Sequence, residues 1–225
     1  MTNGEPGLPG NSEDMAAFFD ARAASYEQHM RETVEDFSRF YCDVADALPA
    51  LGKKPRILDL GIGTGLELDR LFERFPEARV TGIDVSSGML KQLQHKHRPW
   101  AGNLNLIAGS FLQHDLGIET YDAVVSSMAL HHWIPEVKLN LYRRIFQCLK
   151  HGGTFVNGDY VVSEDESNDR LAAFAEAAIN KAHSKHIDLP LSIRQERNLL
   201  KEAGFLSIAT QFERTHVAIL VALKH

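Results

Sequence analysis

The 225-residue chain carries a net charge of −6, and 44% of its residues are hydrophobic and 24% charged. This length and composition predict one globular α/β domain with a small appendage. Proteins that bind nucleic acid usually display a basic patch or an excess of positive charge, and the acidic balance argues against such a partner. The chain has two cysteines and no apolar run of 18 residues, so we expect neither a disulfide framework nor a membrane span.

The first part of the chain predicts helices without strands. Residues 1–11 are rich in Gly and Pro and lack the layout of a secretory signal, so we expect a flexible tail on a cytoplasmic protein. Ser12 is a predicted N-cap, and apolar residues at helical spacing follow it. A second helix is predicted over 34–48, which makes 12–52 a helical segment.

Strands and helices alternate from Pro55 onward. The predicted strands are 57–60, 80–84, 104–108, 122–126 and 154–159. The predicted helices between them are 64–75, 87–97 with Ser86 as its N-cap, and 136–149, which ends at His151-Gly152-Gly153. Such alternation predicts parallel strands with right-handed crossovers, and therefore a doubly wound sheet.

The end of the chain predicts a different connection. Helices are expected over 165–185, with an apolar face suited to a core, and over 192–203. Two strands, 205–213 and 216–223, follow with a tight turn between them, which only antiparallel strands allow. The predicted fold class is therefore α/β, with a seven-stranded mixed sheet of five parallel strands and a C-terminal antiparallel hairpin.

The stretch Arg-Ile-Leu-Asp-Leu-Gly-Ile-Gly-Thr-Gly (56–65) is the most informative motif. A strand that runs into Gly61, Gly63 and Gly65 brings bare backbone against a nucleotide-like ligand. A dinucleotide fingerprint would need its third glycine where Leu66 stands. Asp84 ends the next predicted strand, 19 residues beyond Gly65.

Together with four further markers, these residues resemble the class I S-adenosylmethionine-dependent methyltransferases over 56–225. The further markers are Ser-Gly-Met-Leu (87–90), Tyr-Asp-Ala-Val-Val-Ser (121–126), Leu-Lys-His-Gly-Gly-Thr-Phe (149–155) and Leu-Lys-Glu-Ala-Gly-Phe (200–205). The resemblance implies a Rossmann-like domain over 53–225 that uses S-adenosyl-L-methionine, with a helical insertion at about 163–190. It also implies that 12–52 folds over the cofactor as a lid, as in members that act on small molecules.

The resemblance assigns roles to cofactor-binding residues. The glycine loop would approach the methionine part and sulfonium, with the methionine carboxylate at a helix that begins at Thr64. Asp84 would accept hydrogen bonds from the ribose hydroxyls. Asp59 either orients the loop or reaches the cofactor amine. The remaining candidates are Met89, Ser110 and Phe111 around adenine, with Ser110 in place of an acid usual in the family, Ser127 and Met128 near the sulfonium, and Tyr26 on the lid.

Catalytic candidates follow the fourth and fifth predicted strands. His132 is preferred to His131 as a lining residue or general base, and Asp159 either contacts the acceptor or anchors a loop. His183 and His186 share a helical face, but no Cys or carboxylate stands at metal-ligand spacing, so no metal site is predicted.

The predicted function is methyl transfer from S-adenosylmethionine to the oxygen, nitrogen or carbon of a small molecule. The alternatives are a cofactor-binding protein without catalysis of its own and, less favoured because of the charge, a tRNA methyltransferase. The N-terminal helices and the terminal hairpin are candidate surfaces for a homodimer.

Overall fold

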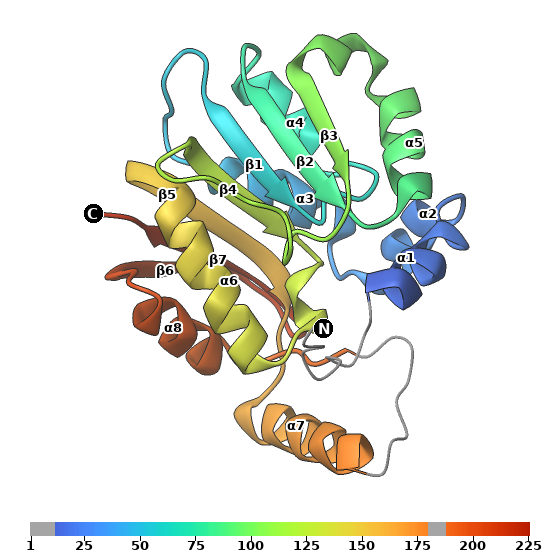
Figure 1. The fold of residues 1–225 in the computed structure, drawn as a ribbon, viewed down its shortest axis with the longest axis vertical. Coiled ribbons are helices and arrows are strands. Elements are labelled where there is room, and N and C mark those ends of the chain that lie inside the picture. The colour runs from blue at the N-terminus through green and yellow to red at the C-terminus, as the bar shows by residue number, and fades with distance from the viewer. Residues whose placement is uncertain (1–11, 180–187) are drawn as a thin grey trace, which may run out of the picture.

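The computed structural model describes residues 12–179 and 188–225, and its centre is a seven-stranded sheet (Figure 1). The strand order is β3-β2-β1-β4-β5-β7-β6, parallel from β3 to β5, with β7 antiparallel to both β5 and β6. The strands are β1 (Arg56–Leu60), β2 (Arg79–Asp84), β3 (Leu104–Ala108), β4 (Tyr121–Ser127), β5 (Leu149–Tyr160), β6 (Ser207–Glu213) and β7 (Val217–Leu223). The predicted fold class is confirmed.

Helices cover both faces of the sheet. On one face α3 (Phe37–Asp46), α4 (Leu68–Arg74) and α5 (Ser87–Lys96) enclose one apolar cluster. On the other face α6 (Pro135–Cys148) and α8 (Ile193–Glu202) enclose a second cluster. The short 3₁₀ helices are η1 (Arg98–Asn103) and η2 (Leu130–His132). A parallel sheet needs this double cover because both of its faces are apolar.

The N-terminal segment contains three helices where two were predicted. They are α1 (Ser12–Asp20), α2 (Tyr26–Thr33) and α3. The predicted helix over 34–48 is shorter than expected because Asp36, with φ +53°, adopts a left-handed conformation that a right-handed helix cannot contain. α1 contacts α5, so this segment lies beside the carboxyl end of the sheet (Figure 1).

The boundary between α6 and β5 also differs from the prediction. The helix ends at Cys148, and β5 begins at the next residue, five residues earlier than expected. Gly152, predicted to terminate the helix, has a φ of +76° inside the first part of β5. The register between β4 and β5 shifts in this region, and the positive φ of Gly152 allows the backbone of β5 to follow this irregularity.

The insertion after β5 holds α7 (Glu164–Ile179), which stands apart from the other helices in Figure 1. The predicted continuation to residue 185 lies outside the described residues, as does the predicted tail 1–11. The apolar face expected to join the core does not do so, since Leu171 and Phe174 are only half-buried and Ala175 is exposed. Within the described ranges, no helix is long and apolar enough to cross a membrane.

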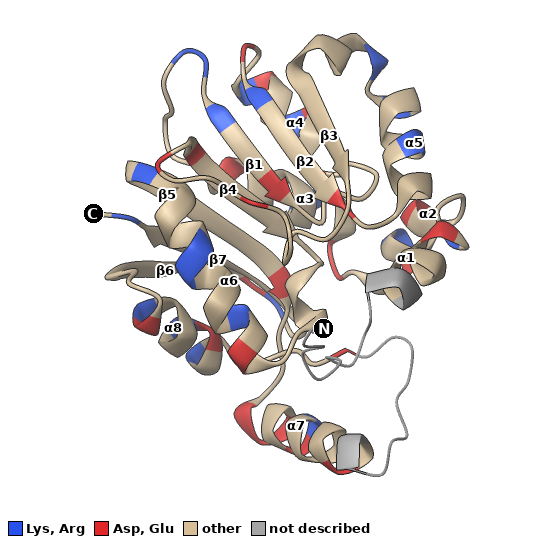
Figure 2. Ribbon diagram, in the orientation of Figure 1, with Lys and Arg blue, Asp and Glu red and all other residues tan. Residues whose placement is uncertain are grey.

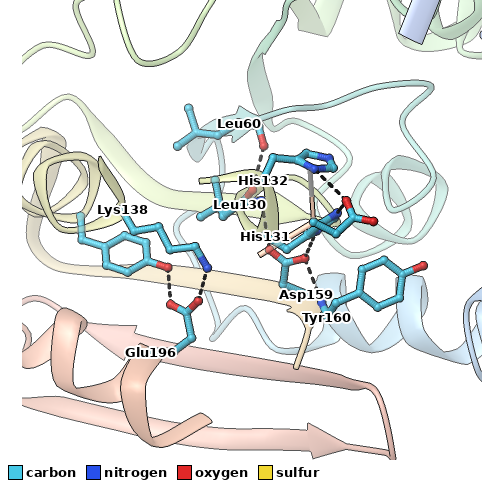
Figure 3. Close-up of polar contacts among 11 residues, drawn as sticks. Leu60, Leu130, His131, His132, Lys138, Asp159, Tyr160 and Glu196 are labelled. Carbon is cyan, nitrogen blue, oxygen red and sulfur yellow. Dashed lines mark hydrogen bonds and ion pairs between the residues drawn. The ribbon is translucent and has the colours of Figure 1, made fainter. Parts of the chain in front are cut away.

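A buried ion pair ties α6 to α8. Lys138 and Glu196 form it (Figure 3), with side chains only 1% and 4% exposed. The Tyr142 hydroxyl donates a hydrogen bond of 2.6 Å to the other carboxylate oxygen of Glu196. Both charges are therefore compensated inside the second apolar cluster.

Candidate functional site

The loop after β1 is built on three left-handed glycines. Gly61, Gly63 and Gly65 have φ values of +75°, +52° and +70°. A right-handed helix cannot form through such residues, so α4 begins only at Leu68. The prediction that the helix begins at Thr64 is therefore wrong, while the role of this loop toward the methionine carboxylate stays a prediction.

Asp84 fastens this loop to the end of β2. Its carboxylate accepts hydrogen bonds from the amides of Gly63 and Ser86, both at 2.8 Å. Each oxygen keeps a further lone pair, which a ligand hydroxyl can use. Burial raises the pKa of Asp84 to about 6, against the opposing effect of the two amides. The geometry thus presents a fixed, nearly buried acceptor beside the glycine loop.

A cavity that is partly open to solvent lies between the loop and the N-terminal helices. Its lining residues come from the N-terminal segment and from the carboxyl ends of four strands. They are Met15, Phe19, Tyr26, Gly61, Gly63, Asp84, Val85, Met89, Ser110, Phe111, Met128, Ala129, His132 and Trp133. The carboxyl edge of a parallel sheet, where the strand order reverses around β1, is the usual ligand site of this architecture.

Most of the predicted cofactor residues meet in this cavity. Three do not line it: Asp59, Gly65 and Ser127. Gly65 faces the core instead, where its carbonyl lies 2.9 Å from Nε2 of the buried His97. Ser127, predicted to line the sulfonium, donates its hydroxyl hydrogen bond to Glu67 at 2.8 Å.

Asp59 and Glu67 form a buried acidic pair beneath the loop. Asp59 is fully buried and Glu67 is 1% exposed. No other group donates a hydrogen bond to either oxygen of Asp59 or to Oε1 of Glu67, and a proton on one carboxyl is shared with the other. Burial raises the pKa of Asp59 well above its ordinary value, and the neighbouring Glu67 carboxyl adds to the effect. Figure 2 shows acidic segments on β1, β2 and β5, the strands that carry Asp59, Asp84 and Asp159.

These acids fit S-adenosylmethionine better than they fit a phosphate-bearing nucleotide. The cofactor carries an ammonium group and a sulfonium, and a buried carboxyl whose pKa is raised ionises more readily when a cation lies beside it. A phosphate would be repelled by the same groups. Met89, Phe111 and Trp133 add apolar and aromatic lining, and Phe111 meets Trp133 edge to face at 6.3 Å, which suits a flat base.

Asp20 attaches α1 to the N-terminus of α5. Its carboxylate accepts hydrogen bonds from the Ser86 hydroxyl at 2.6 Å and the Gly88 amide at 2.8 Å. The Ser86 hydrogen bond, followed by that of Gly88, holds the pKa of Asp20 below its ordinary value. Because Ser86 also donates its amide to Asp84, the N-terminal segment and the candidate ribose site share one hydrogen-bonded network.

A second cavity, also partly open to solvent, adjoins the first. The two share Phe19, Tyr26, Met128 and His132. The lining of the second is completed by Phe18, Arg22, His29, Met30, His131, Tyr160 and Asp188. A ligand in one cavity can therefore meet a ligand in the other across the shared residues.

His131, not the preferred His132, contacts Asp159 (Figure 3). Nδ1 of His131 lies 2.6 Å from Oδ1 of Asp159, and both side chains are about 5% exposed. The Asp159 carboxylate also accepts hydrogen bonds from the amides of Leu130 and Tyr160. Burial alone would raise the pKa of Asp159, but the charge and hydrogen bond of His131 outweigh it and leave that pKa lowered. The imidazole is thus fixed with Nε2 directed away from Asp159.

Asp188 completes a cluster with both histidines. Its Oδ1 lies 3.1 Å from Nδ1 of His132 and 3.6 Å from Nε2 of His131. The histidines predicted to share a helical face, His183 and His186, lie outside the described residues.

Sequence reasoning missed Glu67, Asp20 and Asp188. Glu67 interrupts an apolar run directly after the glycine loop, which is a readable signal for a buried acid. Asp20 and Asp188 look like ordinary surface acids in the sequence, and only their positions in the fold make them members of the site.

Residues 57–153 match the family model described as a methyltransferase domain. With the glycine loop, the strand order and the cavity at the carboxyl edge, this match identifies in the chain a methyltransferase domain of the class I S-adenosylmethionine-dependent type. It is an enzyme of the methyltransferase type with a fold that binds S-adenosylmethionine.

Curated relatives of similar length carry two kinds of name. The chain is 26% identical to the carboxy-S-adenosyl-L-methionine synthase of Campylobacter fetus, over 82% of this chain and 86% of that protein. It is 27% identical to an uncharacterized methyltransferase of Geobacillus sp., over 94% of this chain and 98% of that protein. Among solved structures, human N-acetylserotonin methyltransferase in complex with S-adenosylmethionine superposes with a TM-score of 0.68 and 20% identity. That match covers 96% of this chain but only 60% of the longer human chain.

Proposed function

We propose that the chain transfers the methyl group of S-adenosylmethionine to a small, largely apolar acceptor that carries an ionisable group. The observation that carries the proposal is the pair of adjoining cavities. The first holds most of the candidate cofactor residues, and the second is lined by apolar and aromatic side chains beside the His131, His132 and Asp188 cluster. Their shared wall allows the sulfonium to face the acceptor.

The reaction is an in-line displacement. The bond between the methyl carbon and sulfur breaks, a bond from that carbon to the acceptor atom forms, and S-adenosylhomocysteine leaves. An acceptor hydroxyl or amine also loses a proton, and the imidazoles of the cluster are placed to receive it. Fixing both reactants in adjoining cavities supplies orientation, which accounts for a large share of such catalysis.

The cofactor roles follow from the contacts of the first cavity. Asp84 receives the ribose hydroxyls, Met89, Ser110 and Phe111 surround adenine, and Met128 lies beside the sulfonium. Tyr26 and the glycine backbone at Gly61 and Gly63 enclose the methionine part. Asp59 and Glu67 act from beneath the loop as a buried carboxyl pair, whose ionised form the positive charge of the cofactor would stabilise.

The N-terminal helices act as the lid of both cavities. Phe19 on α1 lies 6.4 Å from the ring of Tyr26 and 5.7 Å from that of His132, between centroids. It therefore bridges the lid and the loop after β4. A homodimer that uses the outer surface of these helices remains a prediction, which sedimentation equilibrium tests.

The name of the Campylobacter relative raises a second candidate, the synthesis of carboxy-S-adenosylmethionine. Such a product carries a carboxylate beside the sulfonium and needs a cation there. Among the described residues, the lining of the first cavity includes no Lys or Arg. Arg22 lines the second, where its guanidinium donates to the Phe18 carbonyl at 3.1 Å and lies over the Phe18 ring. We therefore rank this candidate second.

The test is incubation with cofactor labelled in the methyl group and a panel of small aromatic hydroxyls and amines, RNA and protein. Label should appear in a small molecule, and His131→Ala should reduce transfer by about 10²–10⁴-fold with cofactor binding retained. His95→Ala, on the exposed face of α5, is the matched control. Cofactor binding with transfer to no acceptor would favour the alternative of a binding protein, and a carboxylated cofactor in the mass spectrum would favour the synthase.

A further inference from the structure

The cluster beside the second cavity has the composition of a metal site. Nitrogens of His131 and His132 and a carboxylate oxygen of Asp188 all lie within 4.8 Å of one another. We propose that these three side chains bind a divalent transition-metal ion. The inference rests on the proposed function only where it takes the second cavity to be the acceptor site, since the ion would lie in the wall of that cavity.

The ligand types favour a transition metal over magnesium or calcium. Two imidazoles and one carboxylate are ligands that zinc and iron(II) sites use with positions left open, whereas magnesium and calcium prefer sets made of oxygen atoms. Metal–ligand bonds of about 2.0–2.2 Å require ligand atoms about 3–3.5 Å apart. The separations of 3.1 and 3.6 Å from Asp188 to the two histidines are already close to this range.

Asp159 supplies the support that such a site needs. A histidine that binds a metal through one nitrogen usually donates the other N–H to a carboxylate or carbonyl, which fixes the tautomer and the ring. Nδ1 of His131 is held by Asp159 at 2.6 Å (Figure 3), so in the neutral ring Nε2 carries the lone pair, and it lies 3.6 Å from Oδ1 of Asp188. Asp159 is itself fixed by the amides of Leu130 and Tyr160. Asp159 is thus a positioning residue for the site.

The ion would change how the acceptor is activated. Three protein ligands leave coordination positions open toward the second cavity, which all three residues line. A hydroxyl bound there loses its proton more readily because the cation stabilises the anion. The proton then passes to water, since the imidazoles are occupied as ligands, and the oxygen attacks the methyl carbon.

The experiment is titration of the metal-stripped full chain with cobalt(II), whose visible absorption reports its coordination, followed by competition with zinc. We expect one ion per chain and at least a 100-fold loss of affinity in both Asp188→Ala and His132→Ala. Asp159→Asn should lose about 10–100-fold, as expected for the partner of a metal ligand. His95→Ala and Asp169→Ala, which remove exposed groups of the same kinds elsewhere, should bind as the wild type does.

Circular dichroism and binding of S-adenosylmethionine check that each variant folds. The side chain of Asp188 is 48% exposed, so Asp188→Ala should leave the core intact. It therefore tests the site even if substitutions of the buried His131 prevent folding. No stoichiometric cobalt binding by the wild type, or equal binding by Asp188→Ala, overturns the metal site. Methyl transfer that survives chelation would then leave the proposed function standing without the ion. Metal binding without methyl transfer to any acceptor would support the site and contradict the function.

Discussion

The amide of Gly63 donates a hydrogen bond of 2.8 Å to the carboxylate of Asp84, which joins the loop after β1 to the end of β2. The two residues are 21 positions apart in the chain. The contact makes the shape of the glycine loop depend on the same side chain that is proposed to hold the ribose. A change at Asp84 therefore affects both the cofactor contact and the loop that encloses the cofactor.

Asp84→Asn should weaken binding of S-adenosylmethionine. An amide keeps the size of the side chain but offers one acceptor oxygen in place of two, so one hydrogen bond with the ribose or with a backbone amide is lost. A loss of about 1–3 kcal/mol corresponds to about a 5- to 150-fold rise in Kd, measured by isothermal titration. Asp115→Asn, an exposed acid in the loop after β3, is the control. Unchanged affinity would mean that the ribose is held elsewhere.

Cofactor binding should also depend on pH through Asp84. The ionised carboxylate accepts both hydroxyls, and its pKa in the cofactor-free fold is about 6. The Kd should be constant above about pH 7 and rise about tenfold per pH unit below about 6. The effect on folding has the opposite sign: between 3.8 and about 6 the folded state binds a proton that the unfolded state lacks, so this contribution to stability falls as pH rises. Asp84→Asn should remove the Asp84 component of both trends.

Gly61→Ala should destabilise the protein more than Gly63→Ala. Both glycines have positive φ, which costs a residue with a Cβ about 1–2 kcal/mol. A Cβ at Gly61 would also lie 2.5 Å from Cβ of Ala129, whereas at Gly63 the nearest atom is 3.9 Å away. The overlap should add about 1–3 kcal/mol to the loss in the free energy of unfolding, measured with urea. Gly52→Ala, with nothing within 4 Å, is the control, and equal losses at the two loop positions would contradict the packing argument.

Asp20→Ala should release α1 from α5. The substitution removes the acceptor of the Ser86 and Gly88 hydrogen bonds, so we expect a several-fold rise in the Kd for S-adenosylmethionine with little change in the free energy of unfolding. Hydrogen exchange should become faster over α1 and remain unchanged over α8. If exchange in α1 stays the same, the anchoring role of Asp20 is refuted.

Lys138→Met should leave the charge of Glu196 buried without its partner. Removing one member of a buried ion pair typically costs about 3–5 kcal/mol. Arg143→Met is a matched control on the same helix, because it breaks an ion pair of 3.1 Å with Glu202 whose side chains are 48% and 58% exposed. Exposed pairs contribute about 0–1 kcal/mol, so thermal unfolding should separate the two variants clearly. Similar melting temperatures would show that Glu196 finds another partner.

The number and direction of the strands could be predicted because periodicity and chain connectivity carry that information. Short helical crossovers force parallel neighbours, and the tight turn between the last two strands forces the antiparallel hairpin. Helix boundaries were less predictable. Where α4 begins depends on the φ angles of Gly61, Gly63 and Gly65, and glycine permits either sign of φ, so the sequence leaves that choice open.

The sequence by itself determined the fold class and pointed to the cofactor, because the glycine loop and Asp84 are local motifs at the ends of consecutive strands. The tertiary structure alone decided that His131, rather than His132, contacts Asp159, since adjacent residues in a loop point to different sides. It also decided that Asp188, 56 residues beyond His132, joins the two histidines. Contacts of that separation depend on how the insertion after β5 folds back over the sheet edge, which no local pattern encodes.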